Sequence, residues 1–368
     1  MTTDVAVNLL WCRPGKVGGS EQYLARQLAG LSTVGHPGFN VAVYAPRGFA
    51  AAHGELSGLR IVEHTSNSAN RIARIVRENT WLAARASGAG ITHHGGGTVP
   101  FRTNGATILT VHDVQYLTYP DYFSRARLAY LSYMMPRSLR RADAIAVPSD
   151  YVRGTLIERF GLDPACVHVV VHGIERVDRA RIDVDAARKR FGLGEAPYFI
   201  YPAITHPHKN HAFLVDLLAG PWRASGIELV FIGGEGRAHA ELLGKVAASG
   251  VAERIRFTGH VGATDRDALI AGSSAVLFPS EYEGFGAPVA EAMALGVPVV
   301  ASDRASLPGV VGDGGLVLPL DPDAWADVPT RIEEHRATLI ASGTTRASAF
   351  TLEASGRDLL RVYEGFAR

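Results

Sequence analysis

The chain has 368 residues, with 37 basic against 36 acidic side chains and a net charge of +1. This length corresponds to about two domains at roughly 100–200 residues each. The charge balance lacks the basic excess that the phosphate backbone of nucleic acid demands, so we expect no nucleic-acid partner. Because 47% of the residues are hydrophobic and 20% are charged, a disordered chain is excluded as well.

Signals for targeting and redox state indicate the compartment. Every apolar run is shorter than the roughly 20 residues that span a bilayer. The first apolar run has no basic segment ahead of it, so we expect no export signal. Cys12 and Cys166 are the only cysteines and stand far apart, which fits a reducing compartment. We predict a cytoplasmic protein and leave peripheral association with the inner face of the membrane open.

In the first half of the chain, short β-branched apolar runs alternate with longer stretches of helical periodicity. The predicted strands are 4–11, 40–45, 59–63, 90–92, 106–111, 142–147 and 167–171. The predicted helices are 21–31, 70–86, 125–141 and 151–159. This alternation is typical of βαβ units around a parallel sheet, so we expect an α/β fold. Functional residues are then expected directly after strands.

A charged stretch at 176–196 has no strand character and is predicted to be a linker. The alternation then restarts, with predicted strands at 198–202, 228–232, 256–258, 275–278, 297–301 and 316–318. We therefore predict one domain over 1–175 and a second over 197–345. The helical segment 346–368 is expected to pack back toward the first domain.

Two polar motifs follow predicted strands of the first half. A glycine-rich turn ends in Gly18 and Gly19 and leads into a helix. It is not a P-loop, because Val17 follows its lysine where Ser or Thr is required. His112 and Asp113 end a later strand. They are candidates for a functional pair, and the alternative is a buried His–Asp pair with satisfied hydrogen bonds.

Basic side chains are also concentrated after strands. Lys209, one of four lysines in the chain, follows the first strand of the second half, where a compact ammonium suits a phosphate. The alternative is an ordinary surface lysine. His206 and His208 are expected to be satisfied loop histidines. In the first half, His93 and His94 precede three glycines and are weaker candidates for an acceptor site.

The longest motif, residues 278–300, reads FPSEYEGFGAPVAEAMALGVPVV. Pro288 is expected to open a helix with Ala287 at its N-cap. Because alanine caps poorly, the N–H groups of that helix start are available to an anion such as a diphosphate. Glu283 and Glu291 would repel a phosphate, so their natural partners are hydroxyl groups. The motif predicts a ligand with both phosphates and a polyol, against the alternative of a solvated glutamate pair.

This motif resembles the E-x7-E signature of the family 4 retaining glycosyltransferases. The family pattern E-G-F-G-x-x-x-x-E-A-M-A-x-G-x-P-V matches from Glu283 to Val299. The resemblance is dense over about 198–321 and patchy in the first half. It implies the GT-B fold, in which two Rossmann-like domains face each other across a cleft. It also implies retaining transfer of a sugar from a nucleotide-diphosphate sugar to a hydroxyl.

The resemblance implies roles for single residues of the second half. It makes Glu283 a contact of the donor sugar and Glu291 a contact of the ribose. Backbone groups facing the sugar and diphosphate are implied at Gly284, Phe285, Gly286 and Ala287. Lys209 is implied to hold the diphosphate, and His208 beside it is implied to contact the nucleotide sugar. His208 stands where many relatives have an arginine, which removes a full second charge.

In the first half, the resemblance implies that amides at Gly18 and Gly19 approach the diphosphate. It places His112 at the reaction centre, so that His112, Glu283 and Lys209 are the expected catalytic residues. Asp113 is expected on the acceptor side, together with His93 and His94.

We expect neither a metal nor another cofactor. The candidate histidines lack the H-E-x-x-H or paired-cysteine spacing of metal sites. Two Asp-x-Asp triplets, at 183–185 and 321–323, are predicted to be solvated, because one lies in the linker and the other follows a late strand.

Resemblance to bacterial polysaccharide mannosyl- and rhamnosyltransferases favours GDP-mannose as the donor, with UDP-glucose or UDP-N-acetylglucosamine as the alternative. The acceptor hydroxyl is expected on a glycan, a lipid-linked saccharide or a small molecule. Two other classes remain open: a nucleotide-sugar epimerase or hydrolase on the same fold, and a binding protein without catalysis. The joint presence of His112, Lys209, Glu283 and Glu291 argues against the binding protein.

Overall fold

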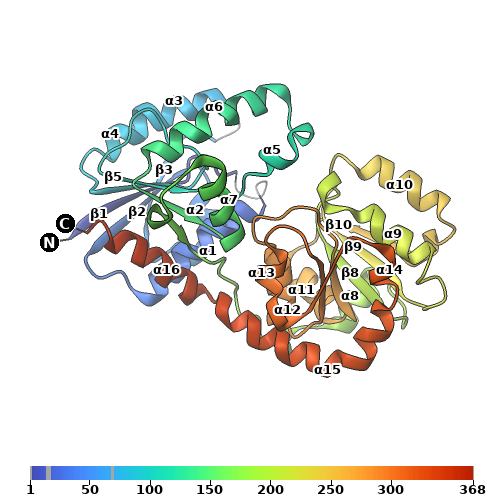
Figure 1. Ribbon diagram of the computed structural model, residues 1–368. Helices are drawn as coiled ribbons and strands as arrows, with labels where there is room; N and C mark the ends of the chain where they lie inside the picture. The colour runs from blue at the N-terminus through green and yellow to red at the C-terminus, as the bar shows by residue number, and fades with distance from the viewer. Residues whose placement is uncertain (1, 14–17, 68–69, 368) are drawn as a thin grey trace. The chain divides into compact units, whose positions relative to one another are not determined.

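The computed structural model describes residues 2–13, 18–67 and 70–367 (Figure 1). The chain divides into two compact units. The first comprises Met1–Gly173 together with Phe350–Arg368, and the second comprises Ile174–Ala349. The C-terminal segment thus belongs with the first half of the chain.

The first unit contains a parallel sheet of seven strands in the order β3-β2-β1-β4-β5-β6-β7. The strands are β1 (Thr3–Asn8), β2 (Phe39–Pro46), β3 (Arg60–His64), β4 (Ile91–His94), β5 (Ala106–Thr110), β6 (Ala144–Val147) and β7 (Val167–Val169). The strand order reverses between β1 and β4, and ligands of such sheets bind at the carboxyl ends of the strands that flank this reversal.

Helices cover both faces of this sheet. They are α1 (Gly19–Val34), α2 (Phe49–Ala52), α3 (Arg71–Arg77), α4 (Ala83–Arg85), α5 (Gln115–Thr118), α6 (Arg125–Arg141), α7 (Asp150–Phe160) and α16 (Leu352–Glu364). Figure 1 shows the sheet with α3, α4 and α6 on one side and α1 and α16 on the other. A π-helical turn at Glu78–Leu82 joins α3 to α4, so the predicted helix 70–86 has a break in its regular hydrogen bonding.

Alternation along β1 builds the two faces. Val5 and Val7 point into the core under α1 and α16, whereas Ala6 packs in a separate core on the opposite face. Helix α16 closes the first core, because a Cβ atom on Gly30 of α1 would lie 1.8 Å from the carbonyl oxygen of Leu352. The two helix backbones therefore touch, which fixes the C-terminal segment on the first unit.

The second unit repeats the same topology with six parallel strands in the order β10-β9-β8-β11-β12-β13. Its strands are β8 (Tyr198–Pro202), β9 (Glu228–Ile232), β10 (Ile255–Gly259), β11 (Ala275–Phe278), β12 (Val299–Ser302) and β13 (Leu316–Leu318). Its helices are α8 (Val184–Arg190), α9 (His211–Ala219), α10 (His239–Ala248), α11 (Ala263–Ala271), α12 (Ala287–Ala294), α13 (Leu307–Val311), α14 (Pro322–Trp325) and α15 (Val328–Ala347). Here the strand order reverses between β8 and β11.

The stretch 176–196 is structured and lies within the second unit. Asp183 caps α8 by accepting a 2.9 Å hydrogen bond from the amide of Ala186. Arg179 donates a 2.5 Å hydrogen bond to the carbonyl of Leu295. The helix cap and this long-range hydrogen bond order the charged segment. Its composition alone did not indicate that it would be ordered.

The predicted α/β class is confirmed, and most predicted strands occur within a residue or two. Strand β1 ends at Asn8 rather than at residue 11, because the Asn8 side chain accepts the amide of Leu10 and turns the chain. In the part of the chain that the structure describes, no helix is both long and apolar enough to cross a bilayer.

Candidate functional site

At the reversal point of the second sheet, the loops after β8 and β11 bring Lys209 and Glu283 together. The Lys209 ammonium donates a 2.5 Å hydrogen bond to Glu283 Oε1 across 74 positions of sequence. Only 18% of the lysine side chain and 12% of the glutamate side chain are exposed. The sheet topology thus places a positive and a negative group, both shielded from water, at the ligand end of the unit.

A buried tyrosine locks the two loops against each other. The Tyr201 hydroxyl donates to the carbonyl of Lys209 at 2.8 Å and lies 2.8 Å from Ser280 Oγ. Burial raises the pKa of this phenol well above its ordinary value, with the nearby Glu283 charge adding to the rise. The amide of Glu281 also donates to the carbonyl of His208 at 2.8 Å. Lys209 and Glu283 are therefore held on a stiff frame.

The helix start after Glu283 leaves its amides without a side-chain cap. Helix α12 begins at Ala287 and its N-cap is Gly286, so the prediction of Ala287 at the N-cap was wrong by one residue. Gly286 has a φ of +93°, and a Cβ atom there would lie 2.8 Å from Leu307 Cδ2. Glycine is therefore needed at this turn. The uncapped N–H groups favour an anion at this point, as the sequence indicated.

Glu291 is the fifth residue of α12 and is 9% exposed. Its carboxylate is close enough to act on Arg266 of α11. Burial lowers the pKa of Arg266, but Glu291 and Asp267 outweigh burial and leave the pKa raised. Arg266 also donates to Asp267 Oδ1 at 2.9 and 2.8 Å. Glu291 is thus embedded in a charged cluster rather than solvated.

The histidines beside Lys209 carry no charge at neutral pH. Burial, followed by the Lys209 charge, lowers the pKa of His208 to about 3. Burial and the Arg237 charge lower the pKa of His206 as well. Lys209 is therefore the cation of this loop. Within the described residues, no group of three or more His, Cys, Asp and Glu side chains is placed to hold a metal ion.

A cavity of about 210 Å³ lies at the carboxyl ends of β8, β9 and β10. Its lining includes Phe231, Glu235, His239 and Phe257, and the rings of His239 and Phe257 meet edge to face at 5.7 Å. Flat apolar walls with a few polar groups suit a planar ring.

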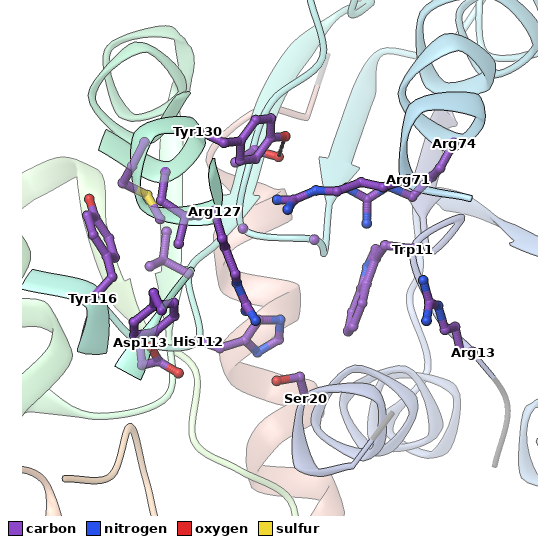
Figure 2. Close-up of a pocket in the computed structure, with 17 residues that line it drawn as sticks. Trp11, Arg13, Ser20, Arg71, Arg74, His112, Asp113, Tyr116, Arg127 and Tyr130 are labelled. Atoms are coloured by element: carbon purple, nitrogen blue, oxygen red, sulfur yellow. Dashed lines mark hydrogen bonds between the residues drawn. The ribbon is translucent and has the colours of Figure 1, made fainter. Parts of the chain in front are cut away.

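The first unit has its own pocket at the carboxyl ends of β1, β4 and β5, about 480 Å³ in volume. Figure 2 shows His112 and Asp113 on one side of it and Trp11 on another. His112 Nε2 donates to the carbonyl of Gly95 at 2.8 Å, which leaves Nδ1 as the acceptor nitrogen of the neutral ring. Burial lowers the pKa of His112, although Gly95 and Asp113 partly oppose it, so the ring is neutral at pH 7.

Gly18 and Gly19 begin α1, with Gly18 as an N-cap that makes no side-chain hydrogen bond. A Cβ atom on either glycine would find nothing within 4 Å. Packing within the described residues therefore does not require glycine at these positions, which leaves room for close approach of a ligand. Residues 14–17 of the glycine-rich turn lie outside the described residues.

His93 and His94 are placed in the core and do not line the pocket. Both are 0% exposed. His93 is hydrogen-bonded to the Tyr363 hydroxyl at 2.8 Å and to Thr110 Oγ1 at 2.7 Å. His94 is bonded to the Asn8 amide and to Thr103 Oγ1. They were expected on the acceptor side, but strand β4 places both rings in the interior, where their hydrogen bonds join neighbouring elements.

Comparison with known families identifies what kind of protein carries these two sites. Residues 17–177 match the family described as Glycosyltransferase Family 4, and residues 196–334 match Glycosyl transferases group 1. O-antigen chain mannosyltransferase B of Escherichia coli is 30% identical over 276 residues, which cover 72% of each chain. The chain belongs to the family 4 glycosyltransferases.

Other comparisons agree with this assignment. A D-inositol 3-phosphate glycosyltransferase of Salinispora tropica is 33% identical over 245 residues, and the match spans 60% of this chain and 51% of that protein. The crystal structure of Anabaena HepE with UDP and glucose matches 99% of this chain with a TM-score of 0.77 and 18% identity. The predicted GT-B fold is therefore confirmed.

A group of arginines in this glycosyltransferase was not predicted from the sequence. Arg13, Arg71, Arg74 and Arg127 all line the pocket that contains His112. Arg71 and Arg74 are three residues apart and therefore lie on one face of a helix, so the sequence alone could have predicted this pair. Helix α6 brings Arg127 to the same pocket. This placement depends on the order of the strands in the sheet, so the spacing of residues in the sequence could not predict it.

Proposed function

We propose that this glycosyltransferase moves a sugar from a nucleotide-diphosphate sugar to an acceptor hydroxyl, with retention at the sugar carbon and without a metal. The observation that carries the proposal is the Lys209 ammonium held near the uncapped start of α12. A fixed cation and oriented N–H groups favour the charge that accumulates on a departing diphosphate. These groups would do the work that a metal ion does in other transferases.

The remaining residues of the second unit fit the other parts of such a donor. Donor binding would shift Lys209 from Glu283 toward the diphosphate, and Glu283 would accept the sugar hydroxyls. Glu291 would hold the ribose. The cavity beside Phe257 would take the base. Backbone amides at Gly18 and Gly19 are proposed to give further donors to the diphosphate.

In the proposed reaction the bond between the sugar carbon and the phosphate oxygen breaks. The acceptor oxygen bonds to the same carbon on the same face, and its proton passes to the departing phosphate oxygen. The protein then needs no general base of its own. A neutral His112 would position the sugar through Nδ1 rather than transfer a proton.

We favour GDP-mannose as the donor, because the relative at 30% identity over most of its length is named a mannosyltransferase. A UDP-sugar is the second candidate, because HepE was crystallised with UDP and glucose. The acceptor hydroxyl is proposed to belong to a glycan, a lipid-linked saccharide or a small molecule.

Thermal unfolding of the full chain with GDP, UDP, GDP-mannose and UDP-glucose tests the donor. A ligand at a hundredfold excess over its dissociation constant stabilises the native state by about 2.7 kcal/mol. We expect one nucleotide class to stabilise the wild type, Lys209→Ala and Glu291→Ala to lose most of the shift, and Lys245→Ala to retain it. A wild type that responds to none of the four would contradict the proposal.

Product analysis tests the chemistry. With the donor known, the anomeric configuration of the product by NMR is expected to equal that of the donor, and activity is expected to survive EDTA. An inverted product, or activity restored only by added metal, would contradict retention or metal independence respectively.

A further inference from the structure

The pocket of the first unit is unusually cationic for a site that receives a neutral sugar hydroxyl. Among the described residues, the pocket lining contains four arginines, at positions 13, 71, 74 and 127, and a single carboxylate, Asp113. Four aromatic side chains, Trp11, Tyr116, Phe123 and Tyr130, line the same pocket. Figure 2 shows Arg71, Arg127 and Trp11 extending into the same space. We propose that this pocket binds a phosphoryl group carried by the acceptor, a proposal that rests on the proposed transferase function.

Two of the arginines are held by aromatic rings. The Arg71 guanidinium of α3 lies 4.1 Å from the centroid of the Tyr130 ring on α6. The Arg127 guanidinium lies 5.1 Å from the centroid of the Phe123 ring. Stacking on a ring fixes the plane of a guanidinium and leaves its in-plane N–H groups directed to the side. Such preorganised forks suit the oxygens of a phosphoryl group.

Arg74 forms an ion pair with a carboxylate of the same helical segment. Its Nε lies 3.8 Å from Glu78 Oε1, and the two side chains are 17% and 10% exposed. Burial raises the pKa of Glu78, although Arg74 and Asn8 oppose the rise. The pair lies where α3 continues into the π-helical turn that begins at Glu78.

Two buried N–H donors of this lining lack hydrogen-bond partners among the described residues, Arg74 Nε and Trp11 Nε1. An unpaired buried donor costs roughly 1–3 kcal/mol. Two such donors in one cationic pocket indicate that the site is completed by an acceptor of hydrogen bonds. The ligand supplies the negative charge and the hydrogen-bond acceptors.

The remaining charged and titratable groups around the pocket do not cancel the arginines. Asp113 accepts the amide of Gln115 at 3.0 Å, and His112 is neutral. A carboxylate ligand fills one guanidinium fork, whereas a phosphoryl group has three terminal oxygens and a second charge. The number and spread of the arginines therefore favour phosphate over carboxylate.

Calorimetric titration of the full chain tests this assignment, first with its nucleotide site saturated by GDP or UDP. The probes are mannose 6-phosphate, mannose and glucuronate. We expect mannose 6-phosphate to bind about tenfold or more tightly than the other two, from one charge-assisted hydrogen bond or more. Equal binding of mannose, or equal binding of glucuronate, would overturn the phosphoryl assignment.

Matched variants locate the binding. Arg71→Gln and Arg127→Gln remove exposed arginines of the pocket, and each is expected to weaken the binding of mannose 6-phosphate about tenfold. The controls Arg77→Gln and Arg125→Gln change arginines of the same two helices that do not line the pocket, and they are expected to have little effect on this binding. Equal weakening by all four would mean that general surface charge binds the probe and would overturn the site. Arg71→Lys keeps the charge and loses the fork, so an intermediate affinity is expected.

Two further arms separate the remaining possibilities. Octyl phosphate replaces the sugar by an alkyl chain, and tighter binding than mannose 6-phosphate would assign the phosphoryl group to a lipid-linked acceptor. The same titrations without nucleotide measure the binding of each probe to the pocket when the nucleotide site is empty. A chain that binds mannose 6-phosphate but no nucleotide would refute the transferase function and leave the phosphoryl site standing. The reverse result would refute the site alone.

Discussion

The Lys209 ammonium and the Glu283 carboxylate form a 2.5 Å hydrogen bond in which both side chains are largely shielded from water. Each residue was expected to contact a different part of the donor, yet in the structure they contact each other. The pair keeps two charged groups compensated in a site of low exposure, where an unpaired charge is expensive. A donor that takes over both partners would replace one set of charge-assisted hydrogen bonds by another.

A double-mutant cycle is expected to show strong coupling between these residues. Lys209→Met and Glu283→Gln should each destabilise the chain, because each leaves the other group partly buried without its partner. The double variant should be less destabilised than the sum, by about 1–3 kcal/mol. Chemical denaturation of the four proteins measures the coupling.

The pair Lys245–Asp216 of the same unit is the matched control. Its ammonium and carboxylate are 2.7 Å apart, with side chains 37% and 57% exposed. We expect coupling of about 0–1 kcal/mol there, since water screens the pair. Equal coupling in both cycles would show that burial of the Lys209–Glu283 pair adds nothing.

Substitution of Gly30 is expected to separate α16 from α1. A Cβ atom at this position would lie 1.8 Å from a backbone oxygen, which no side-chain rotation can relieve. Gly30→Ala should therefore destabilise the first unit by about 3 kcal/mol. Gly154→Ala, in α7, would place its Cβ atom in open space and should stabilise by about 0.5–1 kcal/mol. Thermal unfolding of both variants compares them, and a neutral Gly30→Ala would contradict the close approach of the helices.

The stability of the first unit is expected to fall in acid because of His93 and His94. Burial lowers both pKa values to about 3, with further lowering from His112 and His93 respectively. The unfolded histidines titrate near 6.5, so below this pH the unfolded state binds protons that the folded state does not. Stability is therefore complete above about pH 6.5 and is lost toward pH 3, by about 1.4 kcal/mol per pH unit for each histidine.

Denaturant unfolding between pH 8 and pH 5 measures this slope in the wild type and in His93→Gln. The amide keeps polar contacts with Tyr363 and Thr110 but does not titrate. We expect the slope below pH 6.5 to decrease by about 1.4 kcal/mol per pH unit, and the two proteins to show no slope difference at pH 8. An unchanged slope would mean that His93 is protonated in the folded state.

Local patterns were sufficient for the strands and for the local structure of the 278–300 motif. β-branched runs predicted the sheets, and the 278–300 motif placed Glu283, the glycine turn and the helix start correctly to within one residue. The stretch 176–196 was misjudged because its order comes from the Asp183 cap and from Arg179 contacts across the unit. His93 and His94 were misassigned because their strand position alone does not show which groups lie beside the rings.

The sequence by itself determined the α/β class, the family and the local structure of the 278–300 motif, because each depends on neighbours within one strand–loop–helix segment. The tertiary structure decided which distant residues meet. The order of the strands brings Lys209 to Glu283 and Arg127 to Arg71, and backbone contact at Gly30 fixes the C-terminal helix on the first unit. These relations join residues far apart in the chain, and only the packing of whole elements sets them.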